Sequence, residues 1–321
     1  VLQLAGNLAV PDLPSPSHLL VRLHAAGVNP IDTKVRKLHT YYPNNLPAIL
    51  GCDGAGVVEA AGGSVTRFKP GDEVYFFNNG LGSDPGTYAE YTVVHEDHVA
   101  AKPGNISIEE AAAAPLALIT AWEALMDRGQ LKDGHTVLIH AGAGGVGHIA
   151  IQLARNAGAF VATTVSNAIK AEFVTSLGAE LAINYTTEDF ADAVLDWTDG
   201  MGVKLVLDTV GGPTFCRSFA AAQVYGRVVS LLSTPCDMAA IDTARLRNLT
   251  IGYVQMTAPL YLGIDAARRA QTRILEEGAK LIEQGKIKIR LSDVLPLEQA
   301  AEAHRIVEAG HTTGKVALKI A

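Results

Sequence analysis

The sequence of 321 residues is poor in cysteine and in aromatic residues, which make up 6% of it. Its three cysteines, Cys52, Cys216 and Cys236, are an odd number at wide spacings, and no CxxC pair occurs. This argues against a disulfide framework and against a cysteine-rich zinc site. Such cysteine usage is typical of a reducing compartment, so we expect a cytoplasmic protein.

Long apolar runs and basic clusters are also missing. The longest apolar stretch, residues 111–122, is too short to span a bilayer and contains Pro115. The net charge is −7, and no run of Lys or Arg suggests binding to a phosphate backbone. The first residues carry no starting Met and no signal-peptide pattern. We therefore expect neither a membrane nor a nucleic acid as a partner.

Two patterns divide the chain near residue 115. Before it, short alternating segments such as residues 19–24 are separated by Gly, Pro and Asn turns, which is typical of a compact, irregular β-barrel. After it, strands and helices alternate, which predicts a doubly wound parallel sheet of the α/β class. The predicted strands of this sheet cover residues 136–141, 160–165, 181–184, 205–207, 227–231 and 249–254. A long helix over residues 266–284 and a strand over residues 315–320 follow.

A glycine-rich turn separates the first of these strands from an amphipathic helix. It consists of Gly142, Ala143, Gly144, Gly145, Val146 and Gly147, which fits the G-x-G-x-x-G pattern. In this context the first glycine permits the tight turn, the second lets a pyrophosphate approach the backbone, and the third allows close helix packing. The motif therefore predicts a dinucleotide site at the start of the helix.

The end of the second strand indicates which dinucleotide is bound. An enzyme that uses NAD places Asp or Glu there to hold the ribose 2′-hydroxyl. Residues 160–170 contain no acid and offer Ser166 and Lys170 instead. A hydroxyl and an ammonium suit a 2′-phosphate, so the sequence predicts NADPH. The alternative is that Ser166 caps the next helix and Lys170 is simply solvated.

The ten histidines raise the question of a metal site. His95 and His98 are close in sequence, but they lie in a strand-to-loop stretch without a third ligand nearby. A catalytic zinc needs three protein ligands and an open position. We interpret the pair as solvated loop histidines and expect no metal.

Several segments resemble the signatures of the zinc-independent quinone oxidoreductases and zeta-crystallins, in the medium-chain dehydrogenase/reductase superfamily. They are residues 26–32 (AGVNPID), 51–56 (GCDGAG), 69–74 (KPGDEV), 115–122, the glycine motif, 182–185 (AINY) and 314–316 (GKV). In the related zinc alcohol dehydrogenases the three catalytic ligands would fall at Asn29, Cys52 and about Leu116. None of these residues is of the expected type, and the four-cysteine lobe is absent between residues 72 and 90.

The resemblance implies a fold of two domains. A GroES-like catalytic domain would contain residues 1–115 and 259–321, and a Rossmann NADP-binding domain would occupy residues 116–258. The residues implied to contact NADPH, besides the glycine motif, are Thr120, Ser166, Lys170, Tyr185, Asp208, Val210 and Gly211. Tyr185 would lie beside the adenosine ribose phosphate.

The resemblance also implies a catalytic group. Asn29 would lie by the nicotinamide ribose, with Asp32 close by. Tyr41 and Tyr42 compete for the place of a tyrosine that lines the substrate pocket in the family. For Asp32 and both tyrosines, a packing or turn role is an equal alternative.

The function that follows is hydride transfer from NADPH to a quinone or another α,β-unsaturated carbonyl. One alternative is an enoyl-thioester reductase acting on enoyl-CoA or enoyl-ACP. Another, of a different class, is a crystallin-like NADPH-binding protein with little turnover. Residues 249–254 read as an exposed edge strand without charge, which predicts a homodimer through this edge.

Overall fold

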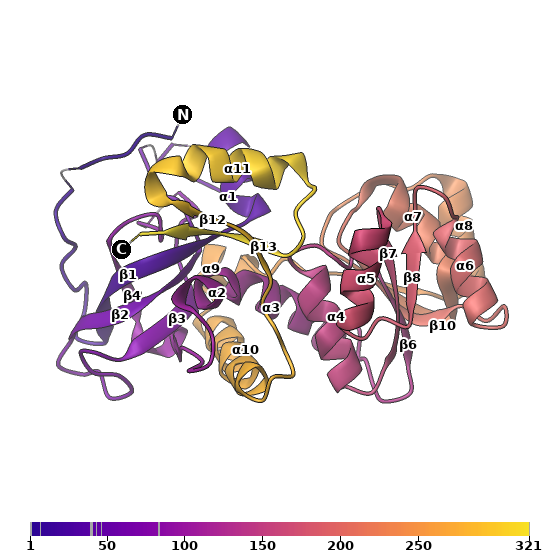
Figure 1. Ribbon diagram of the computed structural model, residues 1–321, viewed down its shortest axis with the longest axis horizontal. Coiled ribbons are helices and arrows are strands. Elements are labelled where there is room, and N and C mark those ends of the chain that lie inside the picture. Colours follow the sequence, from indigo (N-terminus) through magenta and orange to yellow (C-terminus); the bar gives the residue numbers. More distant parts are fainter. Residues whose placement is uncertain are drawn as a thin grey trace. The chain divides into compact units, whose positions relative to one another are not determined.

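The computed structural model describes residues 2–6, 8–38, 41–42, 44–45, 47–82 and 84–320. The chain divides into an outer unit, Val1–Ile119 with Thr257–Ala321, and an inserted unit, Thr120–Met256 (Figure 1). The domain boundaries predicted from the sequence, after residues 115 and 258, lie a few residues from this division. The predicted domain ends at residues 1 and 321 lie outside the described residues.

The outer unit is built on one mixed sheet in the order β12-β13-β1-β2-β3-β5, with β4 paired to β1. Its strands are β1 (His18–Val28), β2 (Asp53–Ala61), β3 (Glu73–Phe77), β4 (Tyr91–His95), β5 (Ala100–Ala101), β12 (Leu291–Pro296) and β13 (Lys315–Lys319). Leu19, Val21 and Leu23 alternate along β1 and are buried in the core, which confirms the strand predicted there. The start and the end of the chain meet because β13 pairs antiparallel with β1, with Val28 opposite Val316.

The helices of the outer unit pack on this sheet and against one another. They are α1 (Pro30–Leu38), α2 (Ile108–Ala113), α9 (Ala258–Tyr261), α10 (Asp265–Glu283) and α11 (Ala300–Ala309), with the short helices η1 (Glu96–His98) and η3 (Leu297–Gln299). The apolar stretch over residues 111–122 forms the end of α2 and all of α3 (Pro115–Trp122). Pro115 begins α3, where its missing N–H costs no hydrogen bond. Within the described ranges, no helix has both the length and the apolarity that a membrane span requires.

The inserted unit contains a six-stranded parallel sheet in the order β11-β10-β9-β6-β7-β8. Its strands are β6 (Thr136–Ile139), β7 (Phe160–Val165), β8 (Leu181–Asn184), β9 (Val203–Asp208), β10 (Ala222–Ser230) and β11 (Thr250–Tyr253). The order runs outward from β6 on one side and from β9 on the other, so it reverses between these two strands. This confirms the predicted doubly wound sheet, and ligands of such sheets bind beyond the carboxyl ends of the strands at the reversal.

Helices connect these strands (Figure 1). They are α4 (Gly147–Asn156), α5 (Ala168–Ser176), α6 (Phe190–Trp197), α7 (Gly212–Ala221) and α8 (Met238–Leu246), and the π-helix η2 (Glu123–Arg128) continues α3. Gly158 follows α4 with a φ of +79°, the left-handed conformation expected of a glycine that ends a helix. The sequence did not predict α8, because it buries only Ala244 and its apolar pattern is correspondingly weak.

Candidate functional site

The glycine motif forms the turn between β6 and α4, and two of its glycines have no room for a side chain. A Cβ on Gly142 would lie 2.0 Å from Oγ1 of Thr163, and a Cβ on Gly147 would lie 2.3 Å from the carbonyl oxygen of Ala141. A Cβ on Gly144 would meet only that oxygen, at 3.1 Å. Gly142 and Gly147 are therefore needed for tight packing, whereas Gly144 faces space that a ligand can enter.

Helix α4 begins directly after this turn. Its N-cap residue is Val146, and within the inserted unit, all of which is described, no side chain caps the helix. The N–H of His148 in the first turn donates to the carbonyl oxygen of Gly144 (3.1 Å), and the positive end of the helix dipole favours an anion at the start of the helix. The turn and the helix together fit the pyrophosphate of a dinucleotide.

A network of uncharged side chains holds the start of the glycine turn by hydrogen bonds. Thr164 accepts hydrogen bonds from the N–H of Ala141 at its Oγ1 (2.9 Å) and from the N–H of Gly142 at its carbonyl oxygen (3.1 Å). The ring of the buried His140 contacts Oγ1 of Thr164 (3.3 Å) and Oγ of Ser218 (2.9 Å). Burial lowers the pKa of His140 to about 4, so the ring is neutral at pH 7. The sequence analysis missed His140, although it is a polar residue between an aliphatic strand and the glycine motif.

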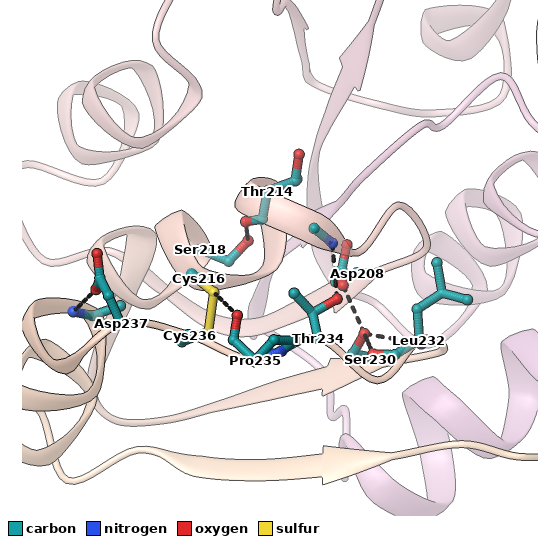
Figure 2. The surroundings of a disulfide bond; sticks show 12 residues. Asp208, Thr214, Cys216, Ser218, Ser230, Leu232, Thr234, Pro235, Cys236 and Asp237 are labelled. Carbon is teal, nitrogen blue, oxygen red and sulfur yellow. Dashed lines mark hydrogen bonds between the residues drawn. A yellow bond between two sulfur atoms is a disulfide. The ribbon is translucent and has the colours of Figure 1, made fainter.

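The loop after β9 lies on the other side of the sheet reversal. The carboxylate of the buried Asp208 accepts the N–H groups of Val210 (3.0 Å) and Gly211 (2.9 Å). It also accepts the hydroxyl of Ser230 (2.6 Å; Figure 2). Thr209 Oγ1 donates to the carbonyl oxygen of His140 (2.8 Å), which ties this loop to the end of β6. Of the three residues predicted to contact the cofactor here, Asp208 is committed to shaping the loop, and Val210 is 47% exposed.

A disulfide joins Cys216 to Cys236, whose Cα atoms are 5.5 Å apart (Figure 2). The sequence-based expectation against disulfides was therefore wrong for these two cysteines, whereas Cys52 is free and buried. Cys216 lies in α7 and Cys236 in the segment after β10, so only the folded sheet brings them together. Thr234 in the same segment accepts the N–H of Gly212 (2.9 Å). The disulfide and this hydrogen bond hold α7, and with it the Asp208 loop, against the segment after β10.

The ends of β7 and β8 bring together the residues predicted to recognise the adenosine ribose. The two strands are parallel neighbours, and the N–H of Tyr185 donates to the carbonyl oxygen of Val165 (3.1 Å). Tyr185 therefore follows β8 beside Ser166, which follows β7. Asn167 caps α5 by accepting the N–H of Lys170 (2.9 Å), so the alternative interpretation of Ser166 as the helix cap is wrong. Ser166 is half-buried and Tyr185 is 53% exposed.

A second polar network, in the outer unit, surrounds Asn29 at the end of β1. The Asn29 side chain donates from Nδ2 to Oδ2 of Asp53 (2.8 Å), and its Oδ1 accepts a hydrogen bond from Nζ of Lys315. Lys315 also donates to the carbonyl oxygen of Val28 (3.3 Å). The backbone N–H of Asn29 donates to Oδ2 of Asp32 (2.8 Å). Asn29, Asp32 and Asp53 are fully buried, and Lys315 is 5% exposed.

Burial shifts the protonation of this network. It raises the pKa of Asp53 to about 7 and the pKa of Asp32 to about 6, although the nearby Lys315 opposes both shifts. It also lowers the pKa of the Lys315 ammonium. Two carboxyl groups share this one cation, so the network can take up a proton near neutral pH.

The network continues from Asp32 toward α11. The hydroxyl of Tyr88 lies 3.3 Å from Oδ2 of Asp32 and 3.2 Å from Nε2 of His304. Burial lowers the pKa of His304 to about 4. Sequence reasoning found Asn29 and Asp32 but missed Asp53, Lys315, Tyr88 and His304. Asp53 and Lys315 do stand within the signature segments 51–56 and 314–316, where a charged residue in a mostly apolar stretch was the available signal.

Known proteins share the fold and the sequence of both units. The family model described as "Alcohol dehydrogenase GroES-like domain" matches residues 15–104, and the family model described as "Zinc-binding dehydrogenase" matches residues 177–318. The quinone oxidoreductase of Pseudomonas aeruginosa is 36% identical over 310 residues, which cover 96% of this chain and 93% of that protein. The chain belongs to the quinone oxidoreductase family of the medium-chain dehydrogenase/reductase superfamily.

Two further members of the quinone oxidoreductase family show its range. The 2-methylene-furan-3-one reductase of Solanum lycopersicum is 35% identical over 327 residues, covering 99% of this chain and 75% of that protein. The crystal structure of the Escherichia coli quinone oxidoreductase complexed with NADPH superposes with a TM-score of 0.84 at 32% identity. That likeness covers 98% of this chain and 94% of the other.

The three positions that hold zinc ligands in the zinc dehydrogenases of the superfamily converge in this quinone oxidoreductase fold. Asn29 and the backbone N–H of Leu116 both donate to Asp53, the latter to Oδ1 at 2.9 Å, and Cys52 precedes Asp53 in the chain. The ammonium of Lys315 is the cation of this group. Across the described ranges, no group of three or more His, Cys, Asp or Glu side chains is arranged to hold a metal ion.

The tyrosines predicted to line the substrate pocket lie beside α9. The hydroxyl of Tyr41 is 2.6 Å from Oγ1 of Thr257, and its ring centroid is 4.9 Å from that of Tyr261. The ring centroid of Tyr42 is 5.5 Å from that of Tyr261. Because the Tyr41 hydroxyl already bonds Thr257, this arrangement favours Tyr42 as the donor to a substrate. Thr120, predicted to lie near the nicotinamide, is a buried residue of α3.

The interpretation of His95 and His98 as solvated loop residues was wrong for His98. This residue lies in η1 and is 8% exposed, and its Nε2 is 3.0 Å from Oδ1 of Asp265. Burial lowers the pKa of His98 to about 3. His98 is therefore a neutral, buried residue that links η1 to α10, a contact between segments too far apart in sequence to be predicted.

Proposed function

We propose that this chain is an NADPH-dependent oxidoreductase that transfers hydride to a quinone or another α,β-unsaturated carbonyl without zinc. The observation that carries the cofactor choice is the set of side chains at the ends of β7 and β8. Tyr185 follows β8 beside Ser166, Lys170 lies in the first turn of α5, and residues 160–170 contain no carboxylate that would repel a 2′-phosphate. The E. coli relative, whose crystal structure contains NADPH, supports the same choice.

The residues of the chain bind and orient, and the cofactor, when bound, supplies the hydride. In this proposal the N–H groups at the start of α4 bind the pyrophosphate, and Asn29 holds the nicotinamide ribose, as the family resemblance implies. Such placement presents the acceptor carbon at a near-attack distance of about 3–3.5 Å. Negative charge that develops on the carbonyl oxygen is met by a hydrogen-bond donor, for which Tyr42 is the first candidate and Tyr41 the second.

The substrate class is tested by following NADPH oxidation with a panel of quinones, enals, enones and enoyl thioesters. The name of the tomato relative, a methylene-furanone reductase, favours an enone as the test substrate. We expect turnover with quinones or enones. Preference for enoyl thioesters would instead support a thioester reductase. Tight NADPH binding without turnover on any of them would support a crystallin-like binding protein.

The proposal includes a homodimer. Strand β11 is the edge of the parallel sheet, and Thr250, Ile251 and Tyr253 on it are exposed. An exposed edge strand without charge offers unpaired backbone groups to a second copy of itself. Light scattering at micromolar concentration is expected to give the mass of a dimer, and a monomer would contradict this part of the proposal.

A cytoplasmic location also remains part of the proposal. It rested on the scarcity of cysteine, and the Cys216–Cys236 disulfide weakens that support because disulfides persist mainly in oxidising compartments. Thiol labelling in freshly lysed cells measures the state of the two cysteines directly. Labelling of both is expected in a reducing cytoplasm, and a fully oxidised pair would contradict this location.

A further inference from the structure

Lys315 is a buried cation whose backbone is fixed from both sides. Its N–H donates to the carbonyl oxygen of Arg290 (2.8 Å), and its carbonyl oxygen accepts the hydroxyl of Ser292 (3.1 Å). Gly314 before it has a φ of +86°, and a Cβ there would lie 2.2 Å from the carbonyl oxygen of Arg290. The pairing of β13 with β1 then directs the Lys315 side chain to the end of β1, where Asn29 lies.

We propose that Lys315 is a positioning residue, which holds the Asn29 carboxamide in one orientation so that Asn29 offers an N–H donor to the cofactor. The inference rests on the proposed function, because it deepens the role of Asn29 toward the nicotinamide half of NADPH. It adds Lys315 and Asp53, which lie in signature segments but were assigned no role from the sequence, to the residues that prepare this role.

The orientation follows from the chemistry of the two neighbours. An ammonium group only donates hydrogen bonds, so the atom of Asn29 that faces Lys315 is the carbonyl oxygen Oδ1. Both oxygens of Asp53 accept from N–H groups, Oδ1 from Leu116 and Oδ2 from Asn29, so the Asn29 atom that faces Asp53 is the amide nitrogen Nδ2. The nitrogen carries two hydrogens, of which Asp53 takes one, and in this proposal the second donates to the cofactor. A flipped amide would place its NH₂ against the ammonium and its oxygen against the carboxylate.

Lys315 also has a second role, as the counter-ion of two buried carboxyl groups. Asp32 and Asp53 are fully buried, and removal of a single partner from a buried charged group is strongly destabilising. A test must therefore separate loss of charge balance from loss of the amide orientation. The two roles differ in what they do to the two halves of the cofactor.

The test compares Lys315→Met with the matched control Lys319→Met, which changes an exposed lysine on the same strand. Binding of NADPH and of adenosine 2′,5′-bisphosphate, which lacks the nicotinamide half, is measured by calorimetry. We expect Lys315→Met to weaken NADPH binding about two- to tenfold, the range for losing one neutral hydrogen bond, and to raise KM for NADPH accordingly. Binding of the bisphosphate should stay at the parent value, and Lys319→Met should change neither ligand.

Equal losses for both ligands in Lys315→Met would show general damage to the fold and overturn the proposal. If Lys315→Met bound NADPH as tightly as the parent protein does, the proposal would be overturned as well. A parent protein that does not bind NADPH would instead refute the proposed function, and this inference with it. The two failures are therefore distinguishable.

The double variant Lys315→Met/Asp53→Asn covers the case in which Lys315→Met does not fold. It removes one buried carboxylate together with the cation, so we expect the melting temperature to recover. The affinity for NADPH should remain below that of the parent, because neither Lys315 nor the Asp53 carboxylate is present to fix the orientation of the Asn29 amide. Recovery of NADPH binding along with stability would show that Lys315 acts only as a counter-ion.

Discussion

The two units of the chain prepare their ligand-binding segments in opposite ways. In the inserted unit the glycine turn rests on Thr164, Ser218 and a neutral His140, and the proposed function has its backbone N–H groups bind the ligand. In the outer unit Asn29 is held by charged groups, with Lys315 on one side and Asp53 on the other. The difference fits the proposed roles: backbone dipoles would suffice for a pyrophosphate, which is an anion, whereas a single amide would need charged neighbours to fix its orientation.

The largest expected effect concerns the inserted unit and its choice of cofactor. Hydrogen bonds from Ser166 and Lys170 to the 2′-phosphate, at about 1.5–3 kcal/mol each, total about 3–6 kcal/mol. This corresponds to a preference for NADPH over NADH in kcat/KM of about two to four decades. The variant Ser166→Ala/Lys170→Ala should lose most of the preference, whereas Lys132→Ala, at an exposed lysine of the same unit, should keep it. Equal Michaelis constants for the two cofactors in the parent would refute this assignment.

Reduction of the Cys216–Cys236 disulfide should destabilise the inserted unit next. A cross-link over a separation of 20 residues contributes about 3 kcal/mol to the free energy of unfolding in the chain-entropy account. Urea unfolding with and without a thiol reductant measures the difference. The Cys216→Ser/Cys236→Ser variant should match the reduced parent and show no response to the reductant. An unchanged midpoint in a parent whose thiols are shown to be free would contradict the expected contribution.

In the outer unit, Tyr42→Phe should lower kcat about ten- to a hundredfold if Tyr42 delivers a proton to the product. An enone is the better test substrate, because an activated quinone needs no such donor. Tyr41→Phe tests the second candidate, and a smaller effect is expected because the Tyr41 hydroxyl already bonds Thr257. If both single variants and the double variant keep the parent rate, water is the proton source.

The network around His140 and the network around Asp53 should change the stability of the fold in opposite directions as the pH falls. The pKa of His140 is lowered from 6.5 to about 4 in the folded chain, so the unfolded chain takes up its proton first and stability falls between about pH 6.5 and pH 4. The pKa of Asp53 is raised from 3.8 to about 7, so the folded chain takes up its proton first and stability rises over about pH 7 to pH 4. Melting temperatures across this range should therefore fall less steeply for His140→Gln than for the parent, and more steeply for Asp53→Asn. The same slope in all three proteins would show that neither group controls the acid response.

The smallest expected effect is that of a chelator. If Lys315 is the cation at the end of β1, incubation with a metal chelator should leave both kcat and the melting temperature unchanged, because the position needs no zinc. Elemental analysis checks the same point. Stoichiometric zinc, with activity lost to the chelator, would overturn this expectation.

Local features explain how much of the fold the sequence predicted. Strands β7 and β8 agree with their predicted ranges, and α4 begins at Gly147 of the glycine motif and ends at Asn156, two residues before the predicted stop at Gly158. These elements depend on periodicity and on turn residues, which act over a few neighbours. Helix α8 was missed because it buries too little surface to show a period.

The residues of the candidate site also differ in whether the sequence could predict them. Residues of the cofactor turn were predictable because they are consecutive and each glycine has its own steric reason. Asp53, Lys315 and His140 were not, because their roles depend on partners 24 or more residues away in the chain. Contacts between residues so far apart in the chain cannot be predicted from composition or from the spacing of motifs.

By itself, then, the sequence determined the alternation of strands and helices in the parallel sheet apart from α8, the glycine-rich turn after β6, and the absence of a carboxylate at the end of the second parallel strand. Only the tertiary structure decided that Cys216 and Cys236 pair, that His98 is buried and neutral, and that one lysine faces one asparagine between two carboxyl groups. The physical reason is that turns and amphipathic periods arise from neighbouring residues. Charge balance and burial arise from side chains that meet only when the chain is folded.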